Sequence, residues 1–177
     1  YKTFMWPASW WARLYEPRIR AAAGLGRAPS GSDPDRYAQR YAHCESLVVG
    51  AGPAGIAAAL EAAARGGRVI LCDEQAEPGG SLLSETRATI DGRPAQVWLA
   101  WALGELAANP RVTILPRTTA FGYFAQNLVA LAERVADHLA APDPNLPRER
   151  LWQVRAREVV LATGAIERPL VFPENDR

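Results

Sequence analysis

The chain contains 177 residues, of which 49% are hydrophobic, and its 20 lysines and arginines nearly balance its 19 aspartates and glutamates. A chain of this size can bury one sizeable core, so we expect one main domain with appendages. The balanced charge provides no field that would attract nucleic acid or an anionic membrane, and no apolar run reaches the roughly 20 residues needed to cross a bilayer.

An aromatic-rich segment opens the chain. Residues 1–26 hold three of the six tryptophans, and the apolar spacing over residues 8–23 predicts a helix that Pro17 breaks or kinks. The first residues, YKTFMWP, contain neither an initiator Met nor the regions of a signal peptide, so we expect the natural protein to begin earlier. So many tryptophans need a surface to cover, and we expect this arm to pack on its own domain, or otherwise on another domain or subunit.

A loop rich in Pro, Ser, Gly and Asp follows the arm, with the sequence APSGSDPDR at residues 28–36. Such a composition is typical of a linker or a surface loop. We therefore place a domain boundary near residue 40. Residues 1–40 form the arm and linker, and residues 41–177 form the main domain.

A strand, a helix and a second strand follow this boundary, and a further helix and strand come after them. The apolar runs and the Gly66-Gly67 helix stop give these elements the ranges 46–50, 53–65, 68–73, about 94–108, and 111–115. Strands that alternate with helices indicate a parallel sheet. Cys44 and Cys72 would then lie toward opposite ends of neighbouring strands, too far apart for a disulfide, and free thiols suit a cytoplasmic protein.

The pattern changes between Thr118 and Val154. The stretches TAFGYFAQ, NLVALAERV and RLWQVR predict short strands joined by turns, that is, a small antiparallel meander over about residues 117–155. REVVLATGA then predicts one more apolar strand, which ends at Thr163 and Gly164. No strand that could close the sheet follows Ala162, so we expect the domain to be incomplete.

The segment LVVGAGPAGIAAAL places a GxGxxG fingerprint between the first strand and the first helix. Gly50 permits the tight turn, Gly52 lets the backbone approach a pyrophosphate, and Gly55 lets the helix lie close to the strand. The phosphates would meet the free amides and the positive dipole end of the helix, and Pro53 suits the first helical turn. The fingerprint therefore predicts a site for a dinucleotide.

An acidic residue, Asp73, ends the second strand about 20 residues after the glycine loop, where a carboxylate accepts the ribose hydroxyls of an adenosine. Glu74 follows directly, and the sequence leaves open which of the two faces the ribose. A carboxylate would repel a 2′-phosphate, which disfavours NADP. Gly79 and Gly80 would let the next loop pass close to the nucleotide. The alternative is a purely structural glycine turn beside a solvated strand end.

We predict no catalytic and no metal-binding residue. His43 and His138 are the only histidines of the sequence, and neither has a Cys or a carboxylate at ligand spacing. A reductase that uses a redox disulfide would need a CxxC or CxxxxC pair, and the two cysteines have neither spacing. The sequence therefore favours a region that holds a nucleotide over one that performs chemistry.

These elements predict an α/β fold: a Rossmann-like FAD/NAD(P)-binding domain with a parallel sheet and a small antiparallel β-meander insertion, preceded by a Trp-rich helical arm. In VVGAGPAG, CDEQ, GGSLL and VVLATGAIERPLVFP, the chain resembles the two-dinucleotide-binding flavoproteins. In YKTFMWP, in LYEPRIRAAAGLG and in the GYFAQN and RVADHL stretches, the chain more narrowly resembles the alpha subunits of heterotetrameric sarcosine oxidases. In that family the alpha subunit is much longer, so the resemblance implies an internal region.

The resemblance implies NAD as the nucleotide of this region, with FAD as the alternative because both share the adenosine diphosphate that the glycines recognise. The assigned cofactor-binding residues are Gly50, Gly52, Pro53, Ala54, Gly55, Asp73, Glu74, Gln75, Gly79, Gly80, Ser81, Thr163 and Gly164.

The resemblance further implies beta, gamma and delta subunits as partners, with FAD and FMN elsewhere in the complex. Such a complex oxidises sarcosine, a small amine, to glycine, passes the one-carbon unit to tetrahydrofolate or releases formaldehyde, and forms hydrogen peroxide. This region alone is expected to be inactive. Two alternatives stay open: the FAD-binding part of an opine oxidase or cyanide-forming glycine oxidase, and a scaffold with an empty loop. The physiological amine and independent folding also stay open.

Overall fold

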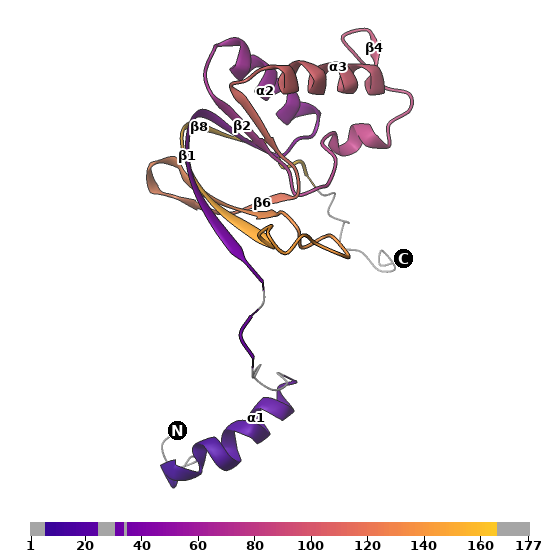
Figure 1. Cartoon of the computed structure of the whole chain (residues 1–177). Coiled ribbons are helices and arrows are strands. Elements are labelled where there is room, and N and C mark those ends of the chain that lie inside the picture. The colour runs from indigo at the N-terminus through magenta and orange to yellow at the C-terminus, as the bar shows by residue number, and fades with distance from the viewer. Residues whose placement is uncertain (1–5, 25–30, 34, 166–177) are drawn as a thin grey trace, which may run out of the picture. The chain divides into compact units, whose positions relative to one another are not determined.

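The computed structural model describes residues 6–24, 31–33 and 35–165. The chain divides into two compact units, Tyr1–Pro34 and Asp35–Arg177, and each is described by itself (Figure 1). Most of YKTFMWP and the end of the ATGAIERPLVFP segment, both used for the resemblance, lie outside the described residues. The larger unit begins a few residues before the boundary predicted near residue 40.

The smaller unit is a helical arm. A 3-10 turn, Ala8–Trp10, leads into a π-helical turn, Trp11–Tyr15, and then into helix α1, Glu16–Ala22. The predicted helix is confirmed, and its irregularity has a clear cause. Pro17 lies in the first turn of α1, where its missing N–H needs no partner, and the preceding turn widens so that Glu16 N–H donates to the carbonyl of Trp11. That the arm packs on its own domain stays a prediction.

The larger unit is built on a six-stranded sheet with the strand order β5-β2-β1-β8-β7-β6. The strands are β1 Tyr37–Val49, β2 Val69–Cys72, β5 Val112–Leu115, β6 Thr118–Phe124, β7 Leu128–Arg134 and β8 Glu149–Leu161. The first four strands in the spatial order run parallel, whereas β7 is antiparallel to both β8 and β6. A separate short hairpin pairs β3, Thr89–Ile90, with β4, Arg93–Pro94. The predicted α/β fold is confirmed.

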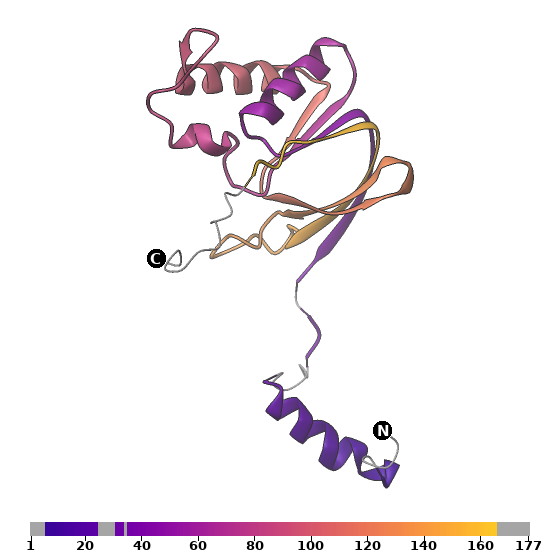
Figure 2. The same cartoon turned by 180° about the vertical axis from the view of Figure 1, so that it is seen from behind.

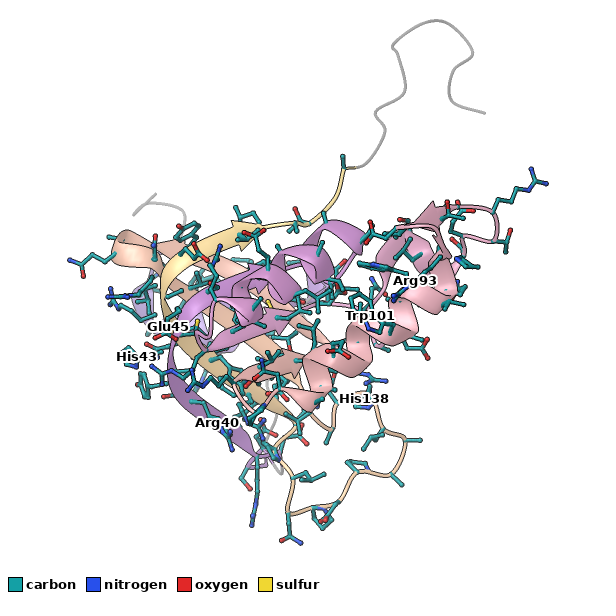
Figure 3. The ribbon with its side chains drawn as sticks, turned by 90° about the horizontal axis from the view of Figure 1, so that it is seen from above. Arg40, His43, Glu45, Arg93, Trp101 and His138 are labelled. Atoms are coloured by element: carbon teal, nitrogen blue, oxygen red, sulfur yellow. The ribbon has the colours of Figure 1, made fainter. Side chains whose placement is uncertain are left out.

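Two helices, α2 Pro53–Ala64 and α3 Ala95–Ala108, lie on the same side of the sheet (Figures 1 and 2). Alternate residues of β1 serve two cores because successive side chains of a strand point to opposite faces. Val48 belongs to the core beneath the helices, while Leu47 and Val49 belong to the core on the other face, which the meander strands complete. At the surface of α3, the guanidinium of Arg93 lies 4.9 Å from the ring centroid of Trp101 (Figure 3).

Two features of the sheet differ from the prediction. The first strand begins at Tyr37 rather than at residue 46, and the segments RLWQVR and REVVL form one strand, β8. The cause is the parallel pairing of β1 with β8, which runs from Tyr37 opposite Glu149 to Val49 opposite Leu161. The first half of β1 is polar and largely exposed, so it carries no apolar alternation that would reveal a strand. The meander is therefore continuous with the main sheet through β8 and is not a separate small sheet.

Both cysteines are free and buried. Burial raises the pKa of the Cys44 thiol to about 11 and that of the Cys72 thiol to about 12, because the thiolate would lose its hydration. In the described ranges, none of the helices combines the length and the apolar character that a membrane span requires.

Candidate functional site

The glycine loop leaves β1 at a place where no side chain fits. Gly50 has a φ of +99°, and a Cβ atom on it would lie 2.4 Å from the carbonyl oxygen of Ala162. A Cβ atom on Gly55 would lie 1.8 Å from the carbonyl oxygen of Gly50, far inside van der Waals contact. These two glycines therefore make the tight turn and the close approach of α2 to the loop, the two roles that the fingerprint predicts.

The middle glycine has a different environment. A Cβ atom placed on Gly52 would meet no atom within 4 Å. This open space lies at the start of α2, where Gly52 is the N-cap and Pro53 stands in the first turn. The first amides of a helix have no partner within the helix, and the dipole end there is positive. The space in front of Gly52, Pro53 and the exposed Ala54 therefore suits a pyrophosphate.

The two carboxylates after β2 differ in direction. One oxygen of Asp73 accepts the main-chain N–H of Ala51 at 2.5 Å, and the other accepts that of Gln75 at 2.8 Å. The exposed carboxylate of Glu74 is 3.4 Å from the side-chain amide of Gln75. Asp73 thus reaches the glycine loop, which the sequence alone did not decide. Gln75 takes part through its main-chain N–H, which donates to the carboxylate of Asp73.

The loop that follows lies directly against the glycine loop. The N–H of Gly79 donates to the carbonyl of Ala51 at 2.7 Å, and a Cβ atom on Gly80 would lie 2.9 Å from Cα of Gly52. Gly79 and Gly80 have φ angles of +143° and +54°, which disfavour other residues. This loop therefore packs against the glycine loop, and its predicted close approach to a nucleotide stays a prediction.

A side chain that the sequence analysis missed holds this second loop. Residues Gly80–Leu83 form a 3-10 turn in which Ser81 is exposed and Leu82 is buried in the core beneath the helices. The amide of Gln96, near the start of α3, donates to the carbonyl of Leu82 at 2.5 Å. A single exposed Gln on a helix gives no signal in the sequence, because its partner lies in a distant loop.

The end of β8 comes back beside the glycine loop. Ala162 donates its N–H to the carbonyl of Val49 at 2.8 Å, and the nitrogen of Thr163 lies 3.1 Å from the Cβ position of Gly50. Gly164 follows with a φ of +76°. The structure therefore brings the glycine loop, Asp73, the Gly79-Gly80 loop and Thr163 together at the carboxyl ends of parallel strands, which is where open α/β sheets bind ligands.

The histidines lie outside this arrangement. His43 precedes the end of β1 by six residues, which corresponds to roughly 20 Å along a strand. Figure 3 shows it far from His138, which follows β7 in an exposed loop. Within the described part of the chain, no three residues among His, Cys, Asp and Glu are grouped so that they could hold a metal ion.

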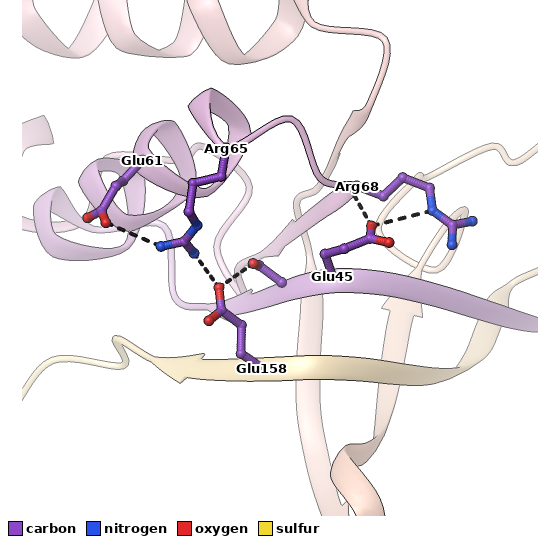
Figure 4. A network of polar contacts seen from close by, with 6 residues as sticks. Glu45, Glu61, Arg65, Arg68 and Glu158 are labelled. Carbon is purple, nitrogen blue, oxygen red and sulfur yellow. Dashed lines mark hydrogen bonds and ion pairs between the residues drawn. The ribbon is translucent and has the colours of Figure 1, made fainter.

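A second polar region lies where α2 ends and β2 begins, in a cleft of about 300 Å³ near the end of α2; Ser46 of β1 and Glu158 of β8 line it three residues before those two strands end (Figure 4). The carboxylate of Glu158 accepts hydrogen bonds from the buried Ser46 hydroxyl, at 2.5 Å, and from Arg65. Glu45 accepts the main-chain N–H of Arg68 at 2.6 Å, which lowers the pKa of this exposed carboxylate. Ser46, Arg65, Glu158 and Glu45 are thus each paired with another side chain or with the adjacent backbone.

The comparisons with known proteins agree with this geometry. Residues 45–160 match the family described as FAD dependent oxidoreductase. The chain is 56% identical, over all its 177 residues, to the Rhizobium meliloti (strain 1021) protein named sarcosine oxidase subunit alpha, and 48% identical over 155 residues, 87% of the chain, to the protein of that name from Corynebacterium sp. (strain P-1). The resemblance to these subunits is confirmed. The chain spans 18% and 16% of their lengths.

Among solved structures, L-proline dehydrogenase from P. horikoshii matches 85% of this chain and 28% of its own chain, with a TM-score of 0.59 and 24% sequence identity. This likeness supports the fold alone. It agrees with the mostly parallel sheet described above.

Proposed function

The chain belongs to the FAD dependent oxidoreductase family, and from this premise we propose that it forms the NAD-binding region of the alpha subunit of a heterotetrameric sarcosine oxidase. The observation that carries the proposal is the 56% identity to a sarcosine oxidase alpha subunit over the whole of this chain. The alignment covers the arm and the meander as well as the glycine loop, so the likeness is not confined to the loop that many families share.

The proposed site uses the residues around the glycine loop in three ways. Residues 50–55 and the start of α2 receive the pyrophosphate, Asp73 accepts the adenosine ribose hydroxyls, and the Gly79-Gly80 loop borders the nucleotide on the side of Gly52. Glu74, Gln75, Ser81, Thr163 and Gly164 complete the proposed site. The open space at Gly52 and the position of Asp73 beside the loop fit such a nucleotide.

Holding the nucleotide, without chemistry, is the proposed role of this region. A nicotinamide or flavin ring supplies hydride transfer when it is bound. Among the described residues that we assign to the site, Asp73 already accepts two backbone N–H groups, and the others contribute mainly backbone and small side chains. We therefore assign no catalytic residue, and we expect this region by itself to be inactive.

In the complete assembly we expect beta, gamma and delta subunits, with FAD and FMN bound outside this region. The proposed reaction is the oxidative demethylation of sarcosine to glycine, with the one-carbon unit passed to tetrahydrofolate or released as formaldehyde and with oxygen reduced to hydrogen peroxide. We propose a cytoplasmic location. Both relatives named above are subunits by name, which supports the expectation of partner subunits.

A second candidate is FAD in the glycine loop, as part of a related oxidoreductase of the opine oxidase or cyanide-forming glycine oxidase type. The observation that favours it is the family match itself, whose description names FAD. The glycine loop recognises adenosine diphosphate, which both nucleotides contain.

The test is to identify the nucleotide of the natural full-length alpha subunit. The subunit is separated from its partners, denatured to release non-covalent nucleotides, and analysed by mass spectrometry, with the beta subunit treated in parallel as a control for carry-over. NAD without FAD is the expected result. FAD in the alpha subunit would favour the second candidate, and neither nucleotide would favour a scaffold with an empty loop.

A further inference from the structure

Ala51 lies in the glycine loop and is fully buried, and both of its main-chain polar groups are bound by one segment, residues 73–79. Its N–H donates to Oδ2 of Asp73 at 2.5 Å, and its carbonyl accepts the N–H of Gly79 at 2.7 Å. A buried N–H that loses its partner is costly, so this peptide depends on Asp73. No other hydrogen bond of the loop is made by a charged side chain among the residues that the structure describes.

Asp73 is itself held in place. Its main-chain N–H donates to the carbonyl of Leu115 at 3.0 Å, and its carbonyl accepts the N–H of Thr118 at 2.7 Å. Its second carboxylate oxygen accepts the N–H of Gln75 at 2.8 Å, which fixes the rotation of the side chain. The carboxylate is therefore a rigid acceptor that is aimed at Ala51 from the end of β2.

We propose that Asp73 is a positioning residue that fixes the glycine loop, through the N–H of Ala51, before any nucleotide binds. A carboxylate oxygen has about two acceptor sites, and each oxygen of Asp73 uses one of them on the backbone. One site on each oxygen is left for a ribose hydroxyl. Asp73 then contributes to affinity in two ways: by contact with the ribose and by holding the loop in its binding shape.

The effect of Asp73 on affinity rests on the proposed function, because it needs a nucleotide. The hydrogen-exchange measurement described first below needs no nucleotide. The full-length alpha subunit, in its complex and depleted of nucleotide, is compared with Asp73→Asn. The asparagine has nearly the same shape but only one acceptor oxygen, so either Ala51 or Gln75 loses its partner. Glu74→Gln is the matched control, since it makes the same chemical change one residue later at an exposed position.

The first readout is amide hydrogen exchange of the peptide that covers Ala51. In Asp73→Asn we expect exchange to be about tenfold faster or more, the change that corresponds to losing one hydrogen bond to a charged group. Exchange in β7 and β8 should be unchanged, and so should all exchange in Glu74→Gln. Should Asp73→Asn not fold, Asp73→Glu keeps a carboxylate, and slow exchange at Ala51 is expected in it. Because the single oxygen of asparagine can stay with Ala51, Asp73→Ala, which has no side-chain acceptor, is measured as well. Unchanged exchange at Ala51 in both variants, or fast exchange in Asp73→Glu, would overturn the proposal.

The second readout separates positioning from contact. Affinity is measured for NAD and for an NAD analogue that lacks both hydroxyls of the adenosine ribose. We expect the variant of Asp73 in which Ala51 exchanges faster to bind even this analogue about tenfold more weakly than the unsubstituted protein does. Equal binding of the analogue would mean that Asp73 acts only on the ribose, and the proposal would fail. If the unsubstituted protein binds no NAD while Ala51 exchanges faster in Asp73→Asn, the positioning role stands and the proposed function fails.

Discussion

Two polar regions of the larger unit use their polar groups in opposite ways: the glycine-loop site at the carboxyl ends of the parallel strands, and the cluster of Ser46, Arg65 and Glu158 near the start of β2. At the glycine loop, a carboxylate and a glycine N–H bind the backbone of Ala51, and open space is left in front of Gly52. In the cluster near the start of β2, Glu158, Ser46 and Arg65 bind one another (Figure 4). A region whose polar groups shape the backbone around an open space can receive a ligand, whereas a region whose side chains are paired mainly supports the fold.

The largest effect should come from Gly55→Ala. The new methyl group would lie 1.8 Å from the carbonyl oxygen of Gly50, so α2 or the loop must move. We expect a loss of about 3 kcal/mol or more in the free energy of unfolding, at the upper end of overpacking effects, together with loss of nucleotide binding. Chemical denaturation monitored by circular dichroism measures the first effect. A variant as stable as the unsubstituted protein would contradict the close approach of helix and loop.

Gly52→Ala should separate binding from stability at the same loop. Gly52 has a φ of −74° and its Cβ position is empty, so alanine fits without strain. The methyl group would instead occupy the space proposed for the pyrophosphate. We expect stability to change by less than about 0.5 kcal/mol, as for substitutions that disturb no contact, while nucleotide affinity falls about tenfold or more.

Isothermal titration of the full-length alpha subunit with NAD checks the Gly52→Ala prediction, and denaturation provides the stability control. Unchanged affinity would place the pyrophosphate elsewhere and would remove the contrast between the two polar regions.

The opposite result is expected in the cluster near the start of β2. Ser46→Ala removes the hydroxyl that donates to Glu158, and the residue is only 3% exposed. We expect a loss of about 1 kcal/mol in the free energy of unfolding and no change in nucleotide affinity. Denaturation and NAD titration of the same variant test both statements. A drop in nucleotide affinity would show that the two polar regions are coupled and would weaken the division between them.

The sequence predicted most of the glycine-loop site, but it did not predict the cluster of Ser46, Arg65 and Glu158. Apolar runs and glycines are local signals, so the strand, loop and helix around Gly50 and Gly55 could be read directly from the chain. The direction of Asp73 could not, because it depends on Ala51, which lies 22 residues earlier. The first half of β1 was missed for a related reason: its polar residues are strand only because β8 pairs with them.

The same limit explains the second polar region. Ser46, Arg65 and Glu158 come from three elements that are far apart in the sequence, and no spacing rule connects them. In the sequence, Ser46 only marks the start of a predicted strand and carries no sign of a partner. Only the parallel register of β1 with β8, which sets Ser46 opposite Glu158, identifies that partner.

The smallest effect is expected at Gly104, a glycine in the interior of α3 that serves as a matched control for Gly55. Both glycines are helical, but a Cβ atom on Gly104 would meet nothing within 4 Å. Gly104→Ala should therefore stabilise the protein by about 0.5–1 kcal/mol, because alanine loses less backbone entropy in a helix. A gain at Gly104 beside a loss at Gly55, measured by the same denaturation, would show that position in the fold and not helix propensity decides the sign. A loss at Gly104 would mean that another part of the assembly covers this face of α3.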